Sequence, residues 1–329
     1  MNKTSKAPTM KDVAREAGVA LGTVSKVFNG LPVGEKYKIS VEQAAERLGY
    51  QVNQYARTLR TNKTNTIALI LPVINNPFYA SLADNCCEIL RQRGYRMLIA
   101  TTFYDPQTEQ QCMDMVQQNK VDGIIAITYN PSLEIREDVP FIIIDRKFES
   151  NVPCVSSDNF SGGMLAAQKL VENGCKKLLF LGDSSSVPGE ADKRVMGFET
   201  YCRQNHVTYD IVRTFDDELF SSIYEYIAQH AGDGVFPFDG IFCNTDVLAC
   251  CVRDALASRG ILAPADVQII GYDGIQKFGT DEFYCSTIRQ PIHEMAEMAI
   301  SLLLSSDRGS LPPLVCLPVT YCYGGTTKS

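Results

Sequence analysis

The 329-residue sequence has no apolar run approaching the roughly 20 residues that a membrane-spanning helix needs. Its first residues, MNKTSKAPTMKDVAREAG, are charged and contain no apolar core of the kind found in a signal peptide. Both absences argue against a membrane protein and against an exported one. We therefore expect a cytoplasmic protein that has no membrane partner.

Cysteine is frequent, but it lacks the spacing of a metal site. The twelve cysteines form no Cys-x-x-Cys pair, and none of the three histidines lies near a cysteine cluster. The adjacent pairs Cys86-Cys87 and Cys250-Cys251 lie in apolar, helix-like contexts, which is typical of buried free thiols. We expect structural thiols and no metal.

Motifs of cofactor binding and catalysis are also missing. No Gly-x-Gly-x-x-Gly fingerprint opens a strand–helix unit, no phosphate loop ends in Gly-Lys-Ser/Thr, and no Gly-x-Ser-x-Gly elbow is present. The segment SGGMLAAQ resembles a nucleotide loop only weakly, and its glycine pair is better explained as the opening of a helix. Acidic runs at 216–218 and 281–282 lie in loop-like stretches that favour solvated surface. We expect no cofactor and no enzymatic activity.

Charge is distributed unevenly along the chain. Residues 1–63 hold 11 Lys+Arg against 5 Asp+Glu, a net charge of +6, and the remainder holds 20 against 33, a net charge of -13, which together give the total of -7. A basic segment on an acidic body indicates that the segment, and not the body, contacts a polyanion.

The basic segment has the pattern of three short helices. Thr9 can cap a first helix, with Asp12 in its first turn, and Gly18 supplies a tight turn before a second helix. Apolar residues at helical spacing give the second and third helices their inner faces: Val24, Val27 and Phe28, then Val41, Ala44, Ala45 and Leu48. This pattern predicts a helix-turn-helix arrangement.

The outward residues of the second helix suit DNA. Gly22 and Thr23 are small enough for close approach to the major groove, and Lys26 can reach a guanine edge or a phosphate. The hydroxyl and amide groups of Thr23, Ser25 and Asn29 suit phosphate oxygens. A merely solvated helix face is the alternative, and the charge asymmetry favours DNA contact.

Beyond residue 65, short apolar runs alternate with amphipathic stretches. Strands are predicted at TIALILP, RMLIAT, GIIAIT and FIIID, and a second series follows at KLLFLG, 211–215, GIFCN and VQIIGYD. Helices are predicted from Pro77 and Pro106 and over 162–173, 192–205, 219–231 and 246–259. Alternating strands and helices predict two doubly wound parallel α/β lobes in tandem, with a cleft between them.

The run MKDVAREAGVALGTVSKVFNG, followed by AAERLGY and NQYARTLR, resembles the lactose-repressor (LacI/GalR) family of bacterial transcription regulators. Looser matches continue in order through NNPFYASL, VDGIIAI, IIIDRKF, VSSDNFSGG, KRVMGFETYC, NTDVLA, IIGYDGI and STIRQPI. The resemblance implies a recognition helix over Leu21–Asn29 and a body of the periplasmic sugar-binding type. The chain departs from the family pattern at Ala20, where Ser is usual, and at Lys26, where Arg is usual.

The resemblance implies an organisation in three parts. These are a helix-turn-helix DNA-binding domain at 1–52, a hinge helix or linker at 53–64, and a two-lobed effector-binding and dimerisation domain at 65–329. The first lobe is expected over about 65–157 plus 288–315, and the second over about 158–285 plus 316–329. Crossovers between the lobes are expected near Ser157, Cys285 and Val315.

The resemblance also implies two sets of site residues. DNA contacts are expected from the head and the hinge: Met10, Lys11, Leu21, Gly22, Thr23, Ser25, Lys26, Asn29, Asn53, Tyr55, Ala56, Arg57, Leu59 and Arg60. Contacts with a small effector are expected in the interlobe cleft: Phe78, Asp145, Arg146, Arg194, Phe220, Thr245, Asp246, Asp273 and Gln290. Asp and Arg pair with vicinal hydroxyls, and aromatic rings cover apolar sugar faces, so we expect a sugar or a sugar phosphate.

Alternatives stay open at several of these positions. A structural salt bridge competes with ligand contact for Arg194 and Asp273, and core packing competes for Phe78 and Phe220. For Asp246 and Gln290, a role in capping a helix or holding a crossover competes with ligand contact.

The hinge segment NQYARTLRTNKTN contains three cations and no carboxylate. Two copies meeting on DNA would bury Ala56 and insert Leu59 into the minor groove, as apolar wedges do. A flexible polar linker is the alternative.

The expected function is a sequence-specific, DNA-binding transcription regulator, most simply a repressor, whose affinity for operator DNA is controlled by the effector. A homodimer is expected because a twofold axis matches a near-palindromic operator. A tetramer is not expected, because the chain ends in YGGTTKS without a leucine heptad stretch. In the bacterial cell the protein would associate with the nucleoid when bound to DNA. The competing function is a sugar-binding transport-type protein without a regulatory role.

Overall fold

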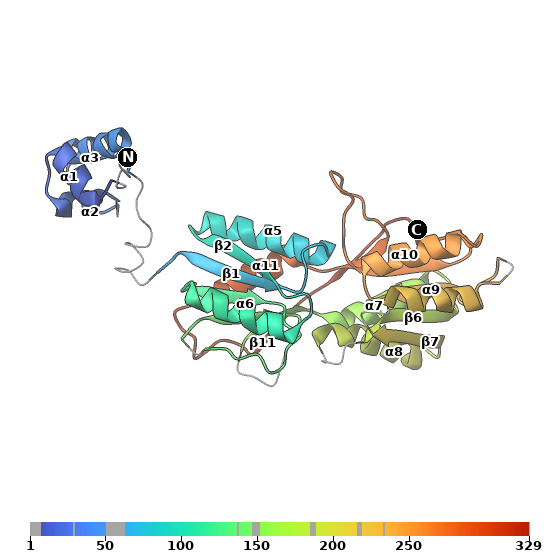
Figure 1. The fold of residues 1–329 in the computed structure, drawn as a ribbon. Helices are drawn as coiled ribbons and strands as arrows, with labels where there is room; N and C mark the ends of the chain where they lie inside the picture. Colours follow the sequence, from blue (N-terminus) through green and yellow to red (C-terminus); the bar gives the residue numbers. More distant parts are fainter. Residues whose placement is uncertain are drawn as a thin grey trace, which may run out of the picture. The chain divides into compact units, whose positions relative to one another are not determined.

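A computed structural model describes residues 8–28, 30–50, 63–136, 138–146, 152–184, 189–215, 219–232 and 234–328. The chain divides into two compact units, Met1–Thr64 and Asn65–Ser329. Figure 1 shows the smaller unit as a group of helices and the larger one as two α/β lobes.

The smaller unit, called the head below, is helical in its described part. It contains α1 (Met10–Ala17), α2 (Leu21–Phe28) and α3 (Glu35–Leu48). Thr9 takes the predicted N-cap position of α1, and its backbone N donates to Asp12 Oδ2 in the first turn at 2.9 Å. Gly18 ends α1 with a φ of 64°, the left-handed conformation that glycine adopts without steric cost. The predicted turn is thereby confirmed.

The head is held together by a small apolar core. Its buried members are Val13, Ala14, Val24, Val41, Ala44 and Ala45. Val27, Phe28 and Leu48 pack against this core while partly buried, and Gly49 ends α3 in the left-handed region. The inner faces predicted for the second and third helices are therefore confirmed.

The larger unit, called the body below, contains two six-stranded sheets. The first has the order β11-β5-β4-β3-β1-β2 and is parallel throughout. Its strands are β1 (Thr66–Leu71), β2 (Arg96–Thr101), β3 (Gly123–Ala126), β4 (Phe141–Ile144), β5 (Cys154–Ser157) and β11 (Leu314–Leu317). The second has the order β12-β10-β9-β8-β6-β7 and is parallel except for β12. Its strands are β6 (Lys177–Ser184), β7 (Thr208–Phe215), β8 (Gly240–Cys243), β9 (Gln268–Asp273), β10 (Ser286–Arg289) and β12 (Thr320–Cys322).

Helices cover both faces of each sheet. On the first sheet, α5 (Pro77–Gln92) and α11 (Ile292–Leu303) share one apolar core, and α6 (Pro106–Gln118) packs on the other face. On the second, α9 (Leu219–His230) and α10 (Asp246–Ala257) share a core, and α7 (Asn159–Glu172) and α8 (Lys193–Gln204) share another. The central strands, such as β1 and β8, are buried on both faces, which explains why they are nearly continuous apolar runs. The predicted doubly wound fold is confirmed.

The chain passes between the two lobes three times. It crosses between β5 and α7, between β10 and α11, and between β11 and β12. The second crossing follows Arg289 and not the expected position near Cys285, because β10 first pairs with β9 to extend the second sheet.

Two adjacent glycines near the start of α7 allow close packing of α7 on its neighbours. A Cβ on Gly163 would lie 1.9 Å from the backbone oxygen of Arg194, and one on Gly162 would lie 2.6 Å from the Tyr272 hydroxyl. The prediction that this glycine pair belongs to a helix is confirmed. The helix begins at Asn159, earlier than predicted, because the Asp158 side chain accepts a hydrogen bond from Ser161 N at 3.0 Å.

Candidate effector site and nucleic-acid interface

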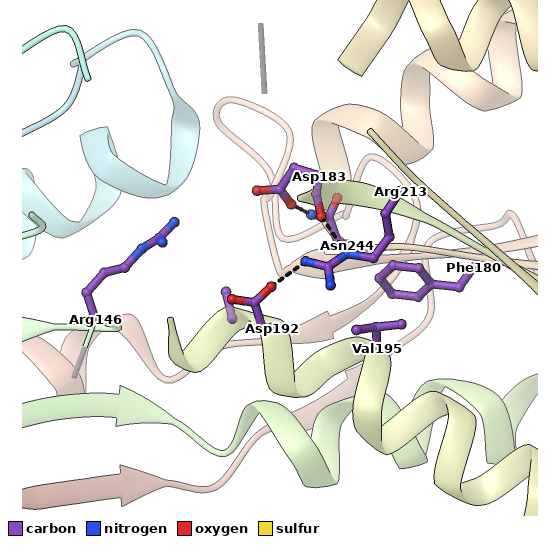
Figure 2. Close-up of a pocket in the computed structure, with 8 residues that line it drawn as sticks. Arg146, Phe180, Asp183, Asp192, Val195, Arg213 and Asn244 are labelled. Atoms are coloured by element: carbon purple, nitrogen blue, oxygen red, sulfur yellow. Dashed lines mark hydrogen bonds and ion pairs between the residues drawn. The ribbon is translucent and has the colours of Figure 1, made fainter. Parts of the chain in front are cut away.

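Both sheets reverse their strand order at a central pair, β1/β3 in the first and β6/β8 in the second. In open α/β sheets, ligands bind at the carboxyl ends of the strands beside such a reversal. A pocket with about 290 Å³ of empty space, part of it open to solvent, lies at this edge of the second sheet. Its walls, drawn in Figure 2, come from Arg146, Phe180, Asp183, Ala191, Asp192, Val195, Arg213 and Asn244.

The second lobe supplies most of the charge in this pocket. Arg213 forms an ion pair with Asp192 and donates through Nε to the backbone oxygen of Asp183 at 2.9 Å. Asn244 Nδ2 donates to the Asp183 carboxylate. These contacts fix the positions of the polar side chains of the second lobe that line the pocket (Figure 2).

Arg146 reaches the same pocket from the first lobe. Its guanidinium lies 3.7 Å from the centre of the Tyr129 ring. The Arg146 side chain also passes close to Gly189, where the absence of a side chain leaves room for it: a Cβ there would lie 2.8 Å from Arg146 Cδ. Glu190 N donates to Asp145 O at 3.0 Å, so the two lobes are in direct contact beside the pocket.

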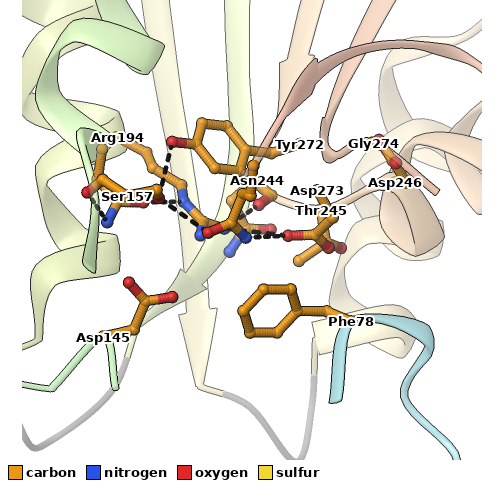
Figure 3. Close-up of polar contacts among 12 residues, drawn as sticks. Phe78, Asp145, Ser157, Arg194, Asn244, Thr245, Asp246, Tyr272, Asp273 and Gly274 are labelled. Carbon is orange, nitrogen blue, oxygen red and sulfur yellow. Dashed lines mark hydrogen bonds and ion pairs between the residues drawn. The ribbon is translucent and has the colours of Figure 1, made fainter. Parts of the chain in front are cut away.

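Arg194, on the first turn of α8, lies at the centre of a second group of polar residues (Figure 3). Its Nε donates to Asn159 Oδ1 at 2.7 Å, and its Nη1 donates to Asn244 O at 2.7 Å. The guanidinium also lies 3.7 Å from the centre of the Tyr272 ring. Arg194 Nη1 is 3.9 Å from Asp273 Oδ1, which is too long for a hydrogen bond.

Asp273 and Gln290 link the residues around Arg194 to two of the segments that cross between the lobes. Gln290 Nε2 donates to Asp273 Oδ1 at 2.7 Å, and Gln290 Oε1 accepts from Ser157 Oγ at 2.8 Å. The Ser157 hydroxyl lies 3.4 Å from the Tyr272 hydroxyl. Asp273 has a φ of 124°, a strained backbone conformation for a residue other than glycine.

The group extends to a carboxylate of the first lobe. Ser156 Oγ donates to Asp145 Oδ1 at 2.7 Å, and Asn159 Nδ2 donates to Ser156 Oγ at 3.0 Å. Through Asn159 and Arg194 the chain of contacts reaches Asp273. We call this set, Asp145, Ser156, Ser157, Asn159, Arg194, Asp273 and Gln290, the cleft network.

Burial shifts the ionisation of the acids in the network. It raises the pKa of Asp145, against the opposing effect of Arg194. It raises the pKa of Asp273 to about 8, again opposed by Arg194 and reinforced by Asp246. Burial alone lowers the pKa of Arg194, but Tyr272 and the neighbouring carboxylates more than offset this, so the net direction is upward. Arg194 therefore stays positively charged, and Asp145 and Asp273 release their protons at a higher pH than carboxyl groups in water do.

One polar atom at the site is left for a ligand. Asn244 Oδ1 is buried and accepts no hydrogen bond within the described part of the chain. A buried acceptor without a partner is costly, and a hydroxylated ligand that donates to it would remove this cost.

The structure brings together Asp145, Arg194, Asp273 and Gln290 of the predicted effector residues and places Arg146 in the adjoining pocket. The buried ring of Phe78, at the start of α5, projects toward the network in Figure 3.

Three other predicted residues lie outside the network. Thr245 caps α10 by accepting from Leu248 N at 3.2 Å, and Asp246 accepts from Ile275 N at 2.7 Å. Phe220 is 42% exposed in the first turn of α9.

Sequence reasoning missed several members of the site. Asn244 is the last residue of the predicted strand GIFCN, immediately before the predicted Thr245, so its position at a strand end was a usable signal. Asn159 follows the expected crossover at Ser157 by two residues. Tyr272 gave no signal, because a fully buried tyrosine inside a strand looks like core.

The predicted DNA contacts in the described part of the head differ in exposure. Lys11, Leu21, Gly22 and Lys26 are exposed, whereas Thr23 and Ser25 are half-buried. Met10 is half-buried and packs against the head core. The predicted contacts at Asn29, Asn53, Tyr55, Ala56, Arg57, Leu59 and Arg60 lie outside the described residues.

Gly22 is not required by the packing of the head. A Cβ added there would meet no atom within 4 Å, and the residue lies inside α2. Glycine inside a helix costs about 1 kcal/mol relative to alanine. Neither packing within the head nor backbone conformation accounts for this cost.

Taken together, a helix-turn-helix head and a two-lobed body with a polar interlobe cleft define a ligand-responsive DNA-binding protein. Residues 9–53 match the family described as bacterial regulatory proteins, lacI family, and residues 64–304 match the periplasmic binding proteins and sugar binding domain of LacI family. The chain belongs to the LacI family of transcription regulators.

Two operon repressors are similar in sequence to this chain over nearly its whole length. A sucrose operon repressor of Streptococcus mutans is 32% identical over 94% of this chain and 96% of its own length. A ribose operon repressor of Bacillus subtilis is 32% identical over 97% of this chain and 98% of its own length.

Solved structures show the same fold. The lac repressor dimer bound to operator and an anti-inducer has a TM-score of 0.83 at 20% identity, covering 98% of this chain and all of that one. A LacI-type protein of Alkaliphilus metalliredigens, complexed with D-xylulofuranose, has a TM-score of 0.69 at 29% identity, covering 80% of this chain and all of that one. Within the described residues, no helix is long and apolar enough to cross a membrane.

Proposed function

We propose that the protein is a repressor of a sugar-utilisation operon whose operator affinity is controlled by a small sugar bound at the cleft network. The observation that carries the proposal is the pair Arg194 and Asp273. Both side chains are about 6% exposed, and they lie 3.9 Å apart without a direct hydrogen bond. Such a pair offers a donor and an acceptor to vicinal hydroxyls.

The relatives named for ribose and sucrose operons, and the D-xylulofuranose complex, support a sugar. The predicted contacts of Phe78, Arg146, Phe220, Thr245 and Asp246 with this sugar are part of the proposal.

The DNA-binding part of the proposal rests on the head. Residues 1–52 form the DNA-binding domain, 53–64 the hinge, and 65–329 the effector-binding and dimerisation domain. The chain acts as a homodimer, as the lac repressor of similar fold does on its operator. Two heads related by a twofold axis then read a near-palindromic site. The protein works in the cytoplasm and has no catalytic role.

The cleft transmits the effector signal through its position between the lobes. Asp145 belongs to the first lobe and Asp273 to the second, and the cleft network joins them. A ligand that binds one lobe arrangement more tightly shifts the population of that arrangement. The operator affinity of the dimer changes as a consequence.

A gel-shift titration with fragments of the protein's own promoter region, at rising salt, separates this function from transport-type sugar binding. A regulator binds with a steep salt dependence, because phosphate contacts release counterions. A transport-type protein binds sugar and leaves the fragments unshifted, and that result would refute the proposal.

The effector is found by a thermal-shift screen of neutral sugars and sugar phosphates. The best ligand is then titrated into Asp273→Ala, with Asp281→Ala, at an exposed loop position, as the matched control. Loss of binding in the first variant alone supports the site. Equal binding by both variants would place the effector elsewhere.

A further inference from the structure

A row of four aromatic side chains lies along the first lobe, at the edge of the sheet that carries Asp145. Tyr129 stands three residues after the end of β3, and Tyr104 stands three residues after the end of β2. Phe78 and Tyr79 open α5, the helix that follows β1. Because β4, β3, β1 and β2 are consecutive parallel strands, their carboxyl ends share one edge. The four rings therefore continue the edge at which the cleft network begins.

The rings of this row contact one another. The centres of the Phe78 and Tyr79 rings lie 5.7 Å apart, and those of Tyr104 and Tyr129 lie 5.0 Å apart, both edge to face. The Tyr79 and Tyr129 hydroxyls are 3.3 Å apart, which joins the two pairs. Phe78 projects toward the cleft network (Figure 3), and Tyr104 is 42% exposed. Aromatic surface thus runs from the network outward to solvent.

Arg146 connects the outer half of the row to the pocket. Its guanidinium lies 3.7 Å from the centre of the Tyr129 ring, and the same residue lines the pocket with Asp183 and Asn244. Tyr129 therefore contacts a wall of the pocket as well as Tyr104. The row is continuous with the effector site and is not a separate surface patch.

The backbone conformation of Tyr104 is unusual for an aromatic residue. Tyr104 has a φ of 60° and Phe103 one of 54°, in the left-handed region that bulky side chains disfavour. The turn is fixed by a hydrogen bond from Phe103 N to Pro72 O at 2.8 Å, and Asp105 follows it as the cap of α6. Because Tyr104 stays partly exposed, this conformation does not serve to bury its ring. Strain of this kind is concentrated at ligand sites.

The shared edge is longer than one sugar ring. Neighbouring strands lie about 4.8 Å apart, so the strand ends from β4 to β2 span about 14 Å. The first-lobe members of the cleft network, Asp145, Ser156 and Ser157, stand at the ends of β4 and β5. Tyr104 stands at the opposite end of the edge. A ring held by the network leaves Tyr104 and Tyr129 for a second ring.

We propose that Tyr104, Tyr129 and Arg146 form a subsite for a second, hydroxylated ring of the effector, which is therefore a disaccharide or another glycoside. Aromatic rings cover the apolar face of a sugar, and the guanidinium donates to its hydroxyls. The first ring lies at the cleft network. The subsite rests on the proposed function, because it extends the same effector site.

The test is isothermal titration calorimetry of the full-length protein with matched sugars. The probes are sucrose, maltose, cellobiose and lactose, together with their units D-glucose, D-fructose and D-galactose. We expect at least one disaccharide to bind roughly tenfold more tightly than each of its own units, because it gains the contact with the second ring.

Tyr104→Gly removes the ring without straining the turn, since glycine adopts a positive φ readily. It should lower the affinity for that disaccharide to about the level of its units and change the affinity for the units far less. Tyr104→Phe keeps the ring and should bind the disaccharide nearly as wild type does. Phe278→Ala, at a fully exposed aromatic position of the second lobe, is the matched control and should bind as wild type. Thermal denaturation of each variant identifies one that fails to fold, and Tyr104→Ala then replaces Tyr104→Gly.

Three outcomes would overturn the subsite. The first is a wild type that binds no disaccharide more tightly than its units. The second is a Tyr104→Gly protein that loses affinity equally for both kinds of sugar. The third is a Tyr104→Gly protein that keeps its disaccharide affinity, and a change in its mass by light scattering would then place the ring in a contact between subunits.

Asp273→Ala separates failure of the subsite from failure of the proposed function. If this variant loses affinity for the sugars that wild type binds, the cleft network remains the effector site even when the subsite is refuted. If it binds those sugars as wild type does, the proposed effector site is itself wrong.

Discussion

Arg194 Nη1 and Asp273 Oδ1 lie 3.9 Å apart in the buried cleft, and each side chain is held by other partners. Asn159 and Asn244 O hold the guanidinium, and Gln290 holds the carboxylate. The two groups lie close together without a direct hydrogen bond. Because their orientations are fixed before a ligand arrives, a ligand that bridges them loses little free energy in ordering the site.

Gly163→Ala tests how that orientation is maintained. The new Cβ would lie 1.9 Å from Arg194 O, so α7 and α8 must move apart and Arg194 must move with them. Overpacking of this kind costs about 1–3 kcal/mol. Thermal denaturation should show the loss of stability, and effector titration should show at least a tenfold loss of affinity.

The control for that change is Gly232→Ala, where a Cβ meets no atom within 4 Å. It should leave both stability and effector affinity near wild type. A Gly163→Ala protein with unchanged effector affinity would show that Arg194 is not positioned by the contact between α7 and α8.

The stability of the protein should depend on pH through Asp273. Its pKa is raised from an ordinary value of 3.8 to about 8, mainly by burial, so the folded state binds this proton more tightly than the unfolded chain. The stabilisation is fully present below about pH 4 and is lost as the pH rises through about 8. Urea unfolding at pH 6, 7, 8 and 9 should therefore give a free energy of unfolding that falls with pH.

Asp273→Asn removes the titrating group and should flatten this decline, while the exposed control Asp281→Asn should keep it. Each unit of pKa difference corresponds to ~1.4 kcal/mol, so the change in slope is measurable. Parallel pH profiles for Asp273→Asn and wild type would mean that another group is responsible.

Gly22→Ala should separate stability from DNA binding. With open space around the position, alanine should stabilise the head by about 0.5–1 kcal/mol. If α2 approaches the major groove closely, the added methyl group should weaken operator binding. Gln43→Ala, at an exposed position of α3, is the control. Tighter operator binding by the stabilised Gly22→Ala would contradict the proposed interface.

Leu59→Ala tests the proposed hinge. Loss of an apolar wedge in the minor groove should weaken operator binding and leave effector affinity unchanged, because the effector site lies in the body. Fluorescence anisotropy with labelled operator and a parallel effector titration measure the two quantities. Thr61→Ala in the same segment is the control, and equal operator affinity for Leu59→Ala would indicate a plain linker.

The fold could be predicted from the sequence because the signals are local. Strands buried on both faces require continuous apolar runs such as TIALIL, and Gly18 and Gly49 end the helices of the head as their conformational freedom suggests. The position of the second crossover was wrong by a few residues, since the pairing of β10 with β9 is a contact between distant segments. Pairing of this kind leaves no local trace in the sequence.

The site was only partly predictable for the same reason. Asp273 and Arg194 were expected from their matches to family segments, and the structure joins them through Asn159 and Gln290. The role of Asn159 depends on α7 packing against α8, which composition does not reveal. Asp246 could have been a ligand contact or a cap, and the structure shows it accepting from Ile275 N and Cys285 Sγ.

The central claim is that a sugar bound at the cleft network controls operator affinity. The most direct measurement is the anisotropy of labelled operator with wild type and with Asp273→Ala, each titrated with the best sugar from the screen. We predict that the two proteins bind operator equally without sugar, that the sugar changes the affinity of wild type at least tenfold, and that it leaves the variant unchanged. A variant that responds at the same sugar concentration as wild type would contradict the account.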